Sequence, residues 1–321
     1  MPNTTPKLLS FCIPTYGQPV QIKRTLDSLL DQDLEGVEIV IRDDNPDSMT
    51  EKIISEYLPR LPIRYFHMNK EGIDPAFLFL SKEAIGSFIW WFGDDILYPG
   101  AIGKVVDVLK CNKKLDFMYI NSTDMGGKNY SVQIGGSRFF RDKNEALLEL
   151  KDQLGFCSAM LFSKEMLLSG LPKAEKFVGS SWVTLFLALN TLVLGKSLYF
   201  LDGKNFLSDP KPAGEIRWYD SFEVHGINFF VIAQEFKDGF DHKTLRKVLA
   251  DKFGDSWRSV IVERALGFET GFASPSPKII KMAKLYWSYP EFYVALPLML
   301  LPRSLLKFFC VCYKRVMNSR R

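Results

Sequence analysis

The chain has 321 residues, of which 47% are hydrophobic. This length and composition allow a large buried core in one domain or in two. Charged residues make up 24% of the chain and the formal net charge is only +4, so basic residues do not dominate as they do in nucleic-acid-binding domains. We therefore expect no nucleic-acid partner.

The cysteine content favours a reducing compartment. The chain contains an odd number of cysteines, and no pair has the spacing of zinc ligands. They are Cys12, Cys111, Cys157, Cys310 and Cys312. The first residues carry no charged leader followed by a long apolar run, so we expect no signal peptide. These features fit a cytoplasmic protein best.

Apolar runs alternate with segments of helical spacing over the first 110 residues. Strands are predicted over residues 8–14, 37–45, 63–69 and 87–95. Helices are predicted over residues 18–31, 50–58, 75–85 and 100–110. His67 lies in a predicted strand and is expected to be structural, near the core. The alternating order predicts an α/β fold with a mostly parallel sheet flanked by helices.

The same alternation continues, less regularly, to about residue 202. Further strands are predicted over 114–123, 155–163 and 197–202, helices over 143–153 and 181–194, and a loop over 124–138. After about residue 220 the pattern predicts only helices, such as 222–237 and 243–267, with a break at 272–278. We expect an α/β domain over 1–215, a helical region over 216–290 and a tail over 291–321.

Two acidic pairs follow predicted strands. Asp43-Asp44 closes the second strand and Asp94-Asp95 closes the fourth. Open parallel sheets bind ligands at the carboxyl ends of their strands, so both pairs are expected at one crevice. Asp94-Asp95 suits Mg²⁺ or Mn²⁺, which takes oxygen ligands and often only one or two protein carboxylates. The alternative for Asp94-Asp95 is an ordinary acidic turn.

The other strand ends also carry residues suited to a nucleotide. A carboxylate in Asp43-Asp44 could accept hydrogen bonds from a base or a ribose, although residues 44–48 also have the composition of a turn and helix cap. Pro14 ends the first strand, and Gly17 lets the backbone approach a ligand. Tyr16 could stack on a nucleobase, and a plain strand-to-helix turn is the alternative.

Taken together, these segments resemble a known family. SFCIPTYGQPVQIKRTLDSLLDQ, VEIVIRDDNPDS and GSFIWWFGDDILYPGAI, in this order and spacing, resemble glycosyltransferase family 2. The resemblance implies a GT-A fold and inversion of the anomeric centre. SAMLFSKE and VGSSWVTLFLAL more distantly resemble bacterial abequosyltransferase-type enzymes, which build surface polysaccharide such as lipopolysaccharide.

The resemblance implies roles for particular residues. The implied nucleotide pocket comprises Pro14, Thr15, Tyr16, Asp43, Asp44, Gly72 and Asp94. Asp44 would contact the base, with Asp43 beside it, and Gly72 would lie along the donor. Asp94 and Asp95 would act in catalysis at the metal, with Asp95 as the direct ligand. The implied cofactor is Mg²⁺ or Mn²⁺, which would absorb the charge that develops on the diphosphate.

The catalytic base is not evident. Family members carry an acidic residue just before the helix predicted at 181–194, but this chain has VGSSWVT there. Neither Ser180 nor Ser181 replaces a carboxylate as a base at neutral pH. The acids considered elsewhere are Asp124, Glu175, Asp209 and Glu215, and Asp209 is taken as the base because its loop could close over the donor.

The last 31 residues are apolar, aromatic and basic. Residues 292–302 are too few to span a bilayer, which takes about 20 residues. The end of the chain then combines apolar residues with Lys314, Arg315, Arg320 and Arg321 and no acid. This composition favours a helix lying in the interface of an anionic membrane, and a helix packed on the protein is the alternative.

These features together predict an enzyme at the cytoplasmic face of the bacterial inner membrane, bound peripherally. It would move a sugar from a nucleoside diphosphate donor to a lipid-linked saccharide. Two alternatives are transfer directly to polyprenyl phosphate, whose oxygen is already anionic, and a non-catalytic protein that binds sugar nucleotides.

Overall fold

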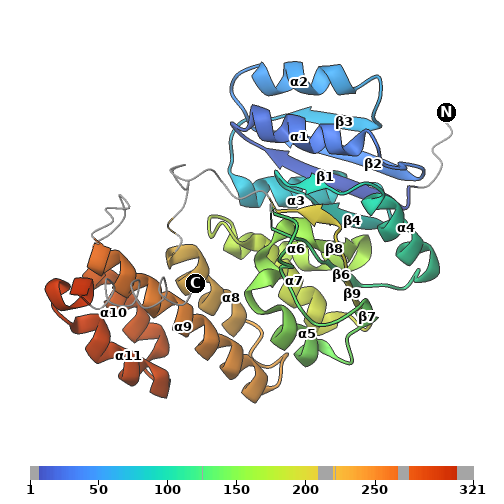
Figure 1. Ribbon diagram of the computed structural model, residues 1–321. Coiled ribbons are helices and arrows are strands. Elements are labelled where there is room, and N and C mark those ends of the chain that lie inside the picture. Colours follow the sequence, from blue (N-terminus) through green and yellow to red (C-terminus); the bar gives the residue numbers. More distant parts are fainter. Residues whose placement is uncertain (1–6, 125, 209–219, 221, 267–274, 309–321) are drawn as a thin grey trace. The chain divides into compact units, whose positions relative to one another are not determined.

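The computed structural model describes residues 7–124, 126–208, 220, 222–266 and 275–308 (Figure 1). The chain divides into two compact units, Met1–Glu215 and Ile216–Arg321. Each unit is described by itself below. Asp209 and Glu215, both considered as the base, lie outside the described residues, as do Cys310, Cys312 and residues 309–321 of the predicted tail.

The first unit is built on one sheet of eight strands. Its strands are β1 (Leu9–Thr15), β2 (Val37–Asp43), β3 (Ile63–His67), β4 (Phe88–Trp91), β6 (Phe117–Ile120), β7 (Arg138–Phe139), β8 (Met160–Ser163) and β9 (Leu198–Leu201). They lie in the order β3-β2-β1-β4-β8-β6-β9-β7. The first four are parallel, whereas β8 runs antiparallel to β4 and β6. The predicted α/β class with a mostly parallel sheet is therefore confirmed.

Seven α-helices accompany the sheet among the described residues of this unit. They are α1 (Pro19–Leu29), α2 (Met49–Tyr57), α3 (Ile73–Glu83), α4 (Ala101–Cys111), α5 (Lys143–Leu150), α6 (Lys164–Ala174) and α7 (Val183–Leu194). Helix α1 packs on α2, while α3 packs on β1 and β2 and meets α6 and α7. The short strands β5 (Ile96–Leu97) and β10 (Phe206–Leu207) form a separate antiparallel pair.

The strand that leads to Asp94-Asp95 lies in the centre of the core. All four residues of β4 are buried. The rings of Phe11 and Trp90 pack edge to face with centroids 5.1 Å apart, and Trp90 Nε1 donates to the carbonyl of Ser158 at 2.8 Å. Because aromatic side chains bury large areas in fixed geometry, this packing makes β4 a rigid base for the residues that follow it.

Several elements differ from the expectation. Strand β4 ends at Trp91 instead of 95, and helix α6 was not predicted. The sequence of α6 contains a glycine and a proline, which hide the helical pattern. The predicted loop 124–138 ends in β7, and α10 begins inside the predicted break 272–278. Prolines are tolerated in the first helical turn because its N–H groups have no intrahelical partner.

The described part of the second unit is helical. It contains a π-helical segment (Glu223–Asn228), α8 (Phe229–Gln234), α9 (His242–Leu266), α10 (Pro275–Tyr286) and α11 (Pro290–Leu300). Aromatic rings fill its core, with Tyr286 against both Phe230 and Phe253. The buried ammonium of Lys278 lies 2.9 Å from Glu263 and 3.5 Å from Asp220. None of the helices in the described ranges is long and apolar enough to cross a membrane.

Candidate functional site

Both acidic pairs lie at one edge of the sheet. In the ladder Thr15 pairs with Asp43, and Asp43 pairs with His67, so β1, β2 and β3 end together. Strand β4 is the other neighbour of β1 and runs parallel to it, and Asp94 and Asp95 follow it closely. Gln18 Nε2, just after β1, donates to Asp94 Oδ2 at 3.3 Å. We call the carboxyl ends of β1, β2 and β4 the acidic edge.

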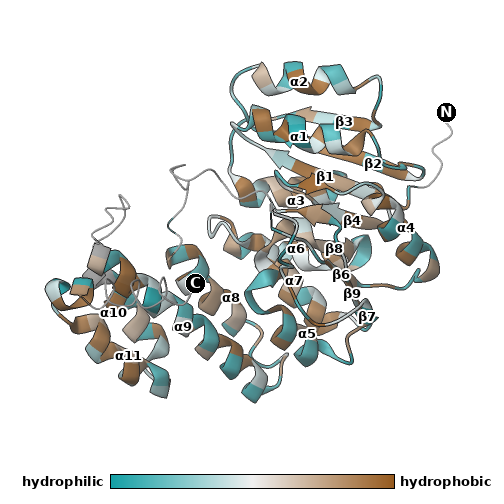
Figure 2. Cartoon of the chain, in the orientation of Figure 1, coloured by the Kyte–Doolittle hydropathy of each residue, from teal (hydrophilic) through white to brown (hydrophobic). Residues whose placement is uncertain are grey.

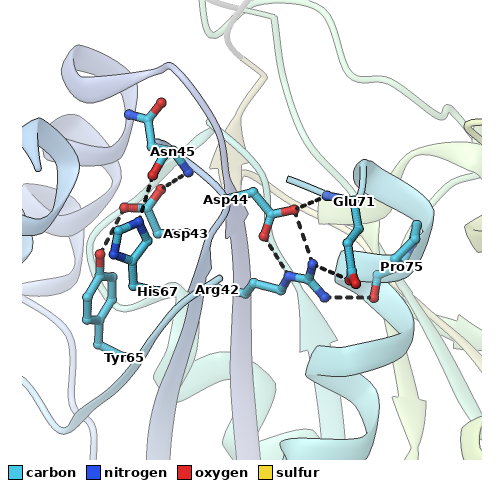
Figure 3. A network of polar contacts seen from close by, with 8 residues as sticks. All are labelled: Arg42, Asp43, Asp44, Asn45, Tyr65, His67, Glu71 and Pro75. Carbon is cyan, nitrogen blue, oxygen red and sulfur yellow. Dashed lines mark hydrogen bonds and ion pairs between the residues drawn. The ribbon is translucent and has the colours of Figure 1, made fainter. Parts of the chain in front are cut away.

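Asp44 is held by a buried arginine (Figure 3). Arg42 Nε lies 2.6 Å from Asp44 Oδ1, and Nη2 lies 3.2 Å from Oδ2. The same guanidinium donates to Glu71 Oε2 at 2.8 Å and to the carbonyl of Pro75 at 3.3 Å. Because the paired fork fixes the carboxylate plane, the orientation of Asp44 is set before any ligand arrives.

Asp43 has a different set of hydrogen-bond partners (Figure 3). Its carboxylate accepts from Tyr65 OH at 2.9 Å and from the Asn45 backbone N–H at 2.9 Å. Burial raises the pKa of Asp43 above its usual value, although these hydrogen bonds oppose the shift. His67 Nε2 lies 2.7 Å from the carbonyl of Asn45. His67 is exposed on β3, so its expected place near the core is wrong, because β3 ends the sheet.

Asp94 and Asp95 differ in their exposure. Asp94 is half-buried, whereas Asp95 is only 3% exposed. Thr25 Oγ1 donates to the backbone carbonyl of Asp95 at 2.9 Å, and the Gly93 N–H donates to Ser158 Oγ at 2.8 Å. Loss of solvation, followed by the charges of Asp95 and Asp94, raises the pKa of Cys157 to about 12. The residues 157–158 therefore lie beside the acidic pair.

The remaining predicted nucleotide residues border the same edge. Pro14 and Thr15 are the last residues of β1, and the Thr15 carbonyl accepts from the Asp44 N–H at 3.1 Å. Thr15 Oγ1 is buried without a hydrogen-bond partner. Lys70 Nζ lies 3.0 Å from Tyr16 OH and 4.2 Å from its ring centroid. Gly72 precedes α3 with a φ of 102°, which a side chain would rarely allow.

The side chains at the acidic edge fit an oxygen-seeking divalent cation. Asp94 and Asp95 supply carboxylates, and Gln18 supplies an amide beside Asp94. Within the described residues no group of three or more His, Cys, Asp and Glu side chains could hold a metal. Mg²⁺ commonly uses one or two carboxylates and takes its other ligands from phosphates and water. Two neighbouring carboxylates match this pattern of ligation.

The base candidates within the described residues are poorly placed. Asp124 is held within its own exposed turn by Lys128 and Asn129. Glu175 is exposed and lies 3.7 Å from Lys82 on the surface. Residues 178–183 contain no acid, as expected from the sequence. These observations leave the loop before α7 without a carboxylate of its own.

A carboxylate from elsewhere in the chain nevertheless reaches that loop. Asp74, in the first turn of α3, accepts from the backbone N–H groups of Gly179 at 2.9 Å, Ser181 at 2.8 Å and Val183 at 3.0 Å. Burial raises the pKa of Asp74, and the three N–H donors oppose that shift. Sequence reasoning missed Asp74, because an acid in a first helical turn looks like an ordinary helix-dipole partner.

Comparison with known proteins agrees with this geometry. Residues 10–168 match the family model described as Glycosyl transferase family 2. An uncharacterized glycosyltransferase of Rickettsia felis is 34% identical over 112 residues, which are 34% of this chain and 18% of the relative. One of Rickettsia typhi is 28% identical over 132 residues, which are 40% of this chain and 41% of the relative. The chain thus spans less than half of these relatives.

Solved structures share the fold. S. aureus TarS in complex with UDP-GlcNAc has a TM-score of 0.67 at 16% identity, covering 88% of this chain and 82% of that chain. The mannosyltransferase PcManGT of Pyrobaculum calidifontis, in complex with GDP-Man and Mn²⁺, has a TM-score of 0.53 at 14% identity, covering 95% and 88%. The fold is that of GT-A proteins such as TarS.

Residues 10–168 therefore form a domain that is similar to glycosyltransferase family 2. This domain contains both acidic pairs and the clamp on Asp44.

Proposed function

We propose that the protein transfers a sugar from a nucleoside diphosphate donor to an acceptor hydroxyl, with inversion. The observation that carries this proposal is the acidic edge, where the clamped Asp44 and the pair Asp94-Asp95 meet within the family 2 domain. TarS and PcManGT, which share the fold, were solved with UDP-GlcNAc and with GDP-Man. A sugar nucleotide is therefore the ligand that best suits this edge.

In this proposal different residues of the acidic edge bind different parts of the donor. Asp44, whose plane Arg42 fixes, accepts a hydrogen bond from the base or ribose through its remaining lone pair. Pro14, Thr15, Tyr16, Asp43 and Gly72 line the nucleotide, and the unpartnered Thr15 Oγ1 supports a polar ligand there. Asp94 and Asp95 would hold Mg²⁺ or Mn²⁺, with Asp95 as the direct ligand. The bound ion would neutralise charge on the diphosphate leaving group.

We further propose a lipid-linked saccharide as acceptor, reached from the cytoplasmic face of the inner membrane. Support comes from the second unit, where α11 is strongly apolar (Figure 2). The large apolar side chains exposed on α11 and the residues after it form what we call the α11 apolar face: Tyr293, Val294, Leu298, Leu300, Leu305 and Phe308. Exposed Arg303 and Lys307 adjoin this face. Apolar surface rimmed by bases suits an anionic membrane.

A second candidate acceptor is polyprenyl phosphate. The observation that favours it is the lack of an acid in residues 178–183, together with the engagement of Asp74 by three backbone N–H groups. An acceptor hydroxyl needs a base, whereas a phosphate oxygen is already anionic. Transfer assays with each acceptor, using one donor, separate the two.

The central test is Asp95→Asn. The amide keeps the size of the side chain but lacks the negative charge that would bind the metal ion. We expect transfer from the best donor in a panel of nucleoside diphosphate sugars to fall about 100-fold or more. Dependence of nucleotide affinity on Mn²⁺, measured by calorimetry, should weaken as well. The control Asp107→Asn removes an exposed acid on α4 and should leave both unchanged.

Full transfer with unchanged metal dependence in Asp95→Asn would remove Asp95 from the proposed site. Metal-dependent nucleotide binding by the wild-type protein without turnover on any acceptor would favour a non-catalytic sugar-nucleotide-binding protein instead.

A further inference from the structure

The loop before α7 is anchored at two separate points. One anchor is Asp74, whose carboxylate receives three N–H groups from residues that lie more than 100 positions later. The other is Trp182, whose Nε1 donates to the carbonyl of Gly155 at 3.2 Å. The loop is thus held from α3 on one side and from the segment before β8 on the other.

Both anchors lead directly to the acidic edge. Asp74 follows Gly72 by two residues, and its neighbour Pro75 accepts from the guanidinium that clamps Asp44. Gly155 precedes the segment 157–158, which contacts Gly93 and lies beside Asp95. Residues 179–182 are therefore tied both to the segment that contacts the Asp44 clamp and to the segment that lies beside Asp95.

The loop is held in a conformation that the chain would not adopt unaided. Ser181 has a φ of 59°, in the left-handed region that costs a residue with a Cβ about 1 kcal/mol or more. Its backbone N–H is one of the three that Asp74 accepts. Such outliers persist where surrounding contacts over-determine them, and they gather at functional sites. Residues 179–181 are half-buried or exposed, whereas Trp182 is 5% exposed and Asp74 is 3% exposed.

We propose that Asp74 is a positioning residue that holds residues 179–182 as the wall beside which donor sugar and acceptor meet. This inference rests on the proposed function, because the acidic edge must bind the sugar nucleotide. Asp44 holds the nucleotide end in that function, so the sugar extends toward Asp95. The Trp182 anchor brings the loop to that end. Asp74 thereby links nucleotide clamp and acceptor wall through the short segment 72–75.

The test is Asp74→Asn, which preserves shape and removes one of the two acceptor oxygens. At least one of the three N–H groups then faces an amide donor, and leaving it unpaired is costly. Amide exchange at residues 179, 181 and 183 should quicken about tenfold, since the loop opens locally. Transfer should fall about 10- to 100-fold, as displacement by about 1 Å does at an active site, while nucleotide affinity stays within about twofold.

The matched control is Asp142→Asn. Asp142 is also a carboxylate that accepts backbone N–H groups, those of Asn144 and Glu145 at the start of α5. Asparagine caps helices about as well as aspartate, so exchange in the 179–183 loop and transfer should both stay at wild-type values.

Ser181→Gly provides a second, independent readout. Glycine adopts a φ of this sign without strain, so the single variant should raise the thermal midpoint. Added to Asp74→Asn, it should restore part of the lost exchange protection, because the loop then needs less support.

The proposal would be overturned if Asp74→Asn showed the same amide exchange and the same rate of sugar transfer as the wild-type protein. So would a loss of nucleotide affinity in proportion to transfer, since that would show a general structural role. Absence of turnover in the wild-type protein would instead count against the proposed function, and the exchange measurements would still decide whether Asp74 holds the loop.

Discussion

At the scale of single residues, the geometry of Asp44 depends on an arginine that never needs to touch a ligand. The Arg42 side chain is 1% exposed, and it ties Asp44 to Glu71 and Pro75 at the start of α3. A buried ion pair is stable only when its hydrogen bonds are well satisfied, and here the guanidinium has several acceptors. The orientation of Asp44 and the position of residues 71–75 therefore depend on the same contacts of Arg42.

Arg42→Lys tests this dependence. Lysine keeps the charge but cannot form the paired contact, so Asp44 loses its fixed plane. We expect the free energy of unfolding to fall by about 1–3 kcal/mol, measured by urea denaturation, because buried polar atoms lose partners. Nucleotide affinity should fall in the same variant.

Arg141→Lys is the matched control for that experiment. Its side chain is 84% exposed and pairs with Glu145 on the surface, so the change in stability should stay within about 0.5 kcal/mol. Equal effects of the two substitutions would show that the clamp has no special role.

At the scale of elements, the approach of the α7 loop to the 155–158 segment depends on a missing side chain. A Cβ placed on Gly155 would overlap the indole of Trp182. The same ring donates to the Gly155 carbonyl, so close packing and hydrogen bonding act together. The start of α7 is therefore anchored at this contact to the segment that precedes β8.

Gly155→Ala should force Trp182 out of place. Overpacking of this kind costs about 1–3 kcal/mol, and the thermal midpoint should fall accordingly. Tryptophan fluorescence should shift as the indole gains solvent, which locates the change at this contact.

Gly103→Ala is the opposite substitution in the same unit. Gly103 lies within α4, and nothing stands within 4 Å of an added Cβ. Alanine in a helix interior is favoured over glycine by about 0.5–1 kcal/mol, so this variant should be more stable. A similar loss of stability in both variants would contradict the packing argument.

At the scale of the whole molecule, exposed apolar side chains are unevenly distributed. The α11 apolar face concentrates six of them within residues 293–308 of the second unit, with Trp287 exposed shortly before it. The opposite side of α11 is buried through Phe292, Ala295 and Met299. The membrane proposal assigns the exposed side of α11 to a lipid surface, because exposed apolar patches mark interaction sites.

The double substitution Val294→Glu with Leu298→Glu tests the membrane proposal. Both side chains are exposed, at 75% and 42%, so folding should be little affected. We expect binding to vesicles containing anionic phosphatidylglycerol, measured by flotation, to fall about tenfold or more, because charge opposes insertion.

Val20→Glu with Ile85→Glu adds the same charge at exposed positions of the first unit, and should leave vesicle binding nearly unchanged. Equal losses in the two double variants would indicate a general charge effect and contradict a role for the α11 apolar face.

Local sequence was sufficient to predict the elements whose apolar pattern is uninterrupted. The buried runs of β1, β2 and β4 and the acids after them are visible as apolar segments that end in polar residues. Because parallel strands end at one edge of a sheet, the order of the strands predicts Asp44, Asp94 and Asp95 at the same edge. Helix α6 escaped because glycine and proline interrupt its pattern.

Contacts between distant segments were decided only by the tertiary structure. No local pattern pairs Asp74 with Gly179, or Gly155 with Trp182, since these contacts depend on how α3, α7 and the 155–158 segment pack. The Arg42 clamp likewise joins β2 to the start of α3. The sequence by itself determined which acidic residues follow which strands. The tertiary structure decided from which backbone N–H groups these and other carboxylates accept hydrogen bonds, because hydrogen-bond partners must lie close together in space.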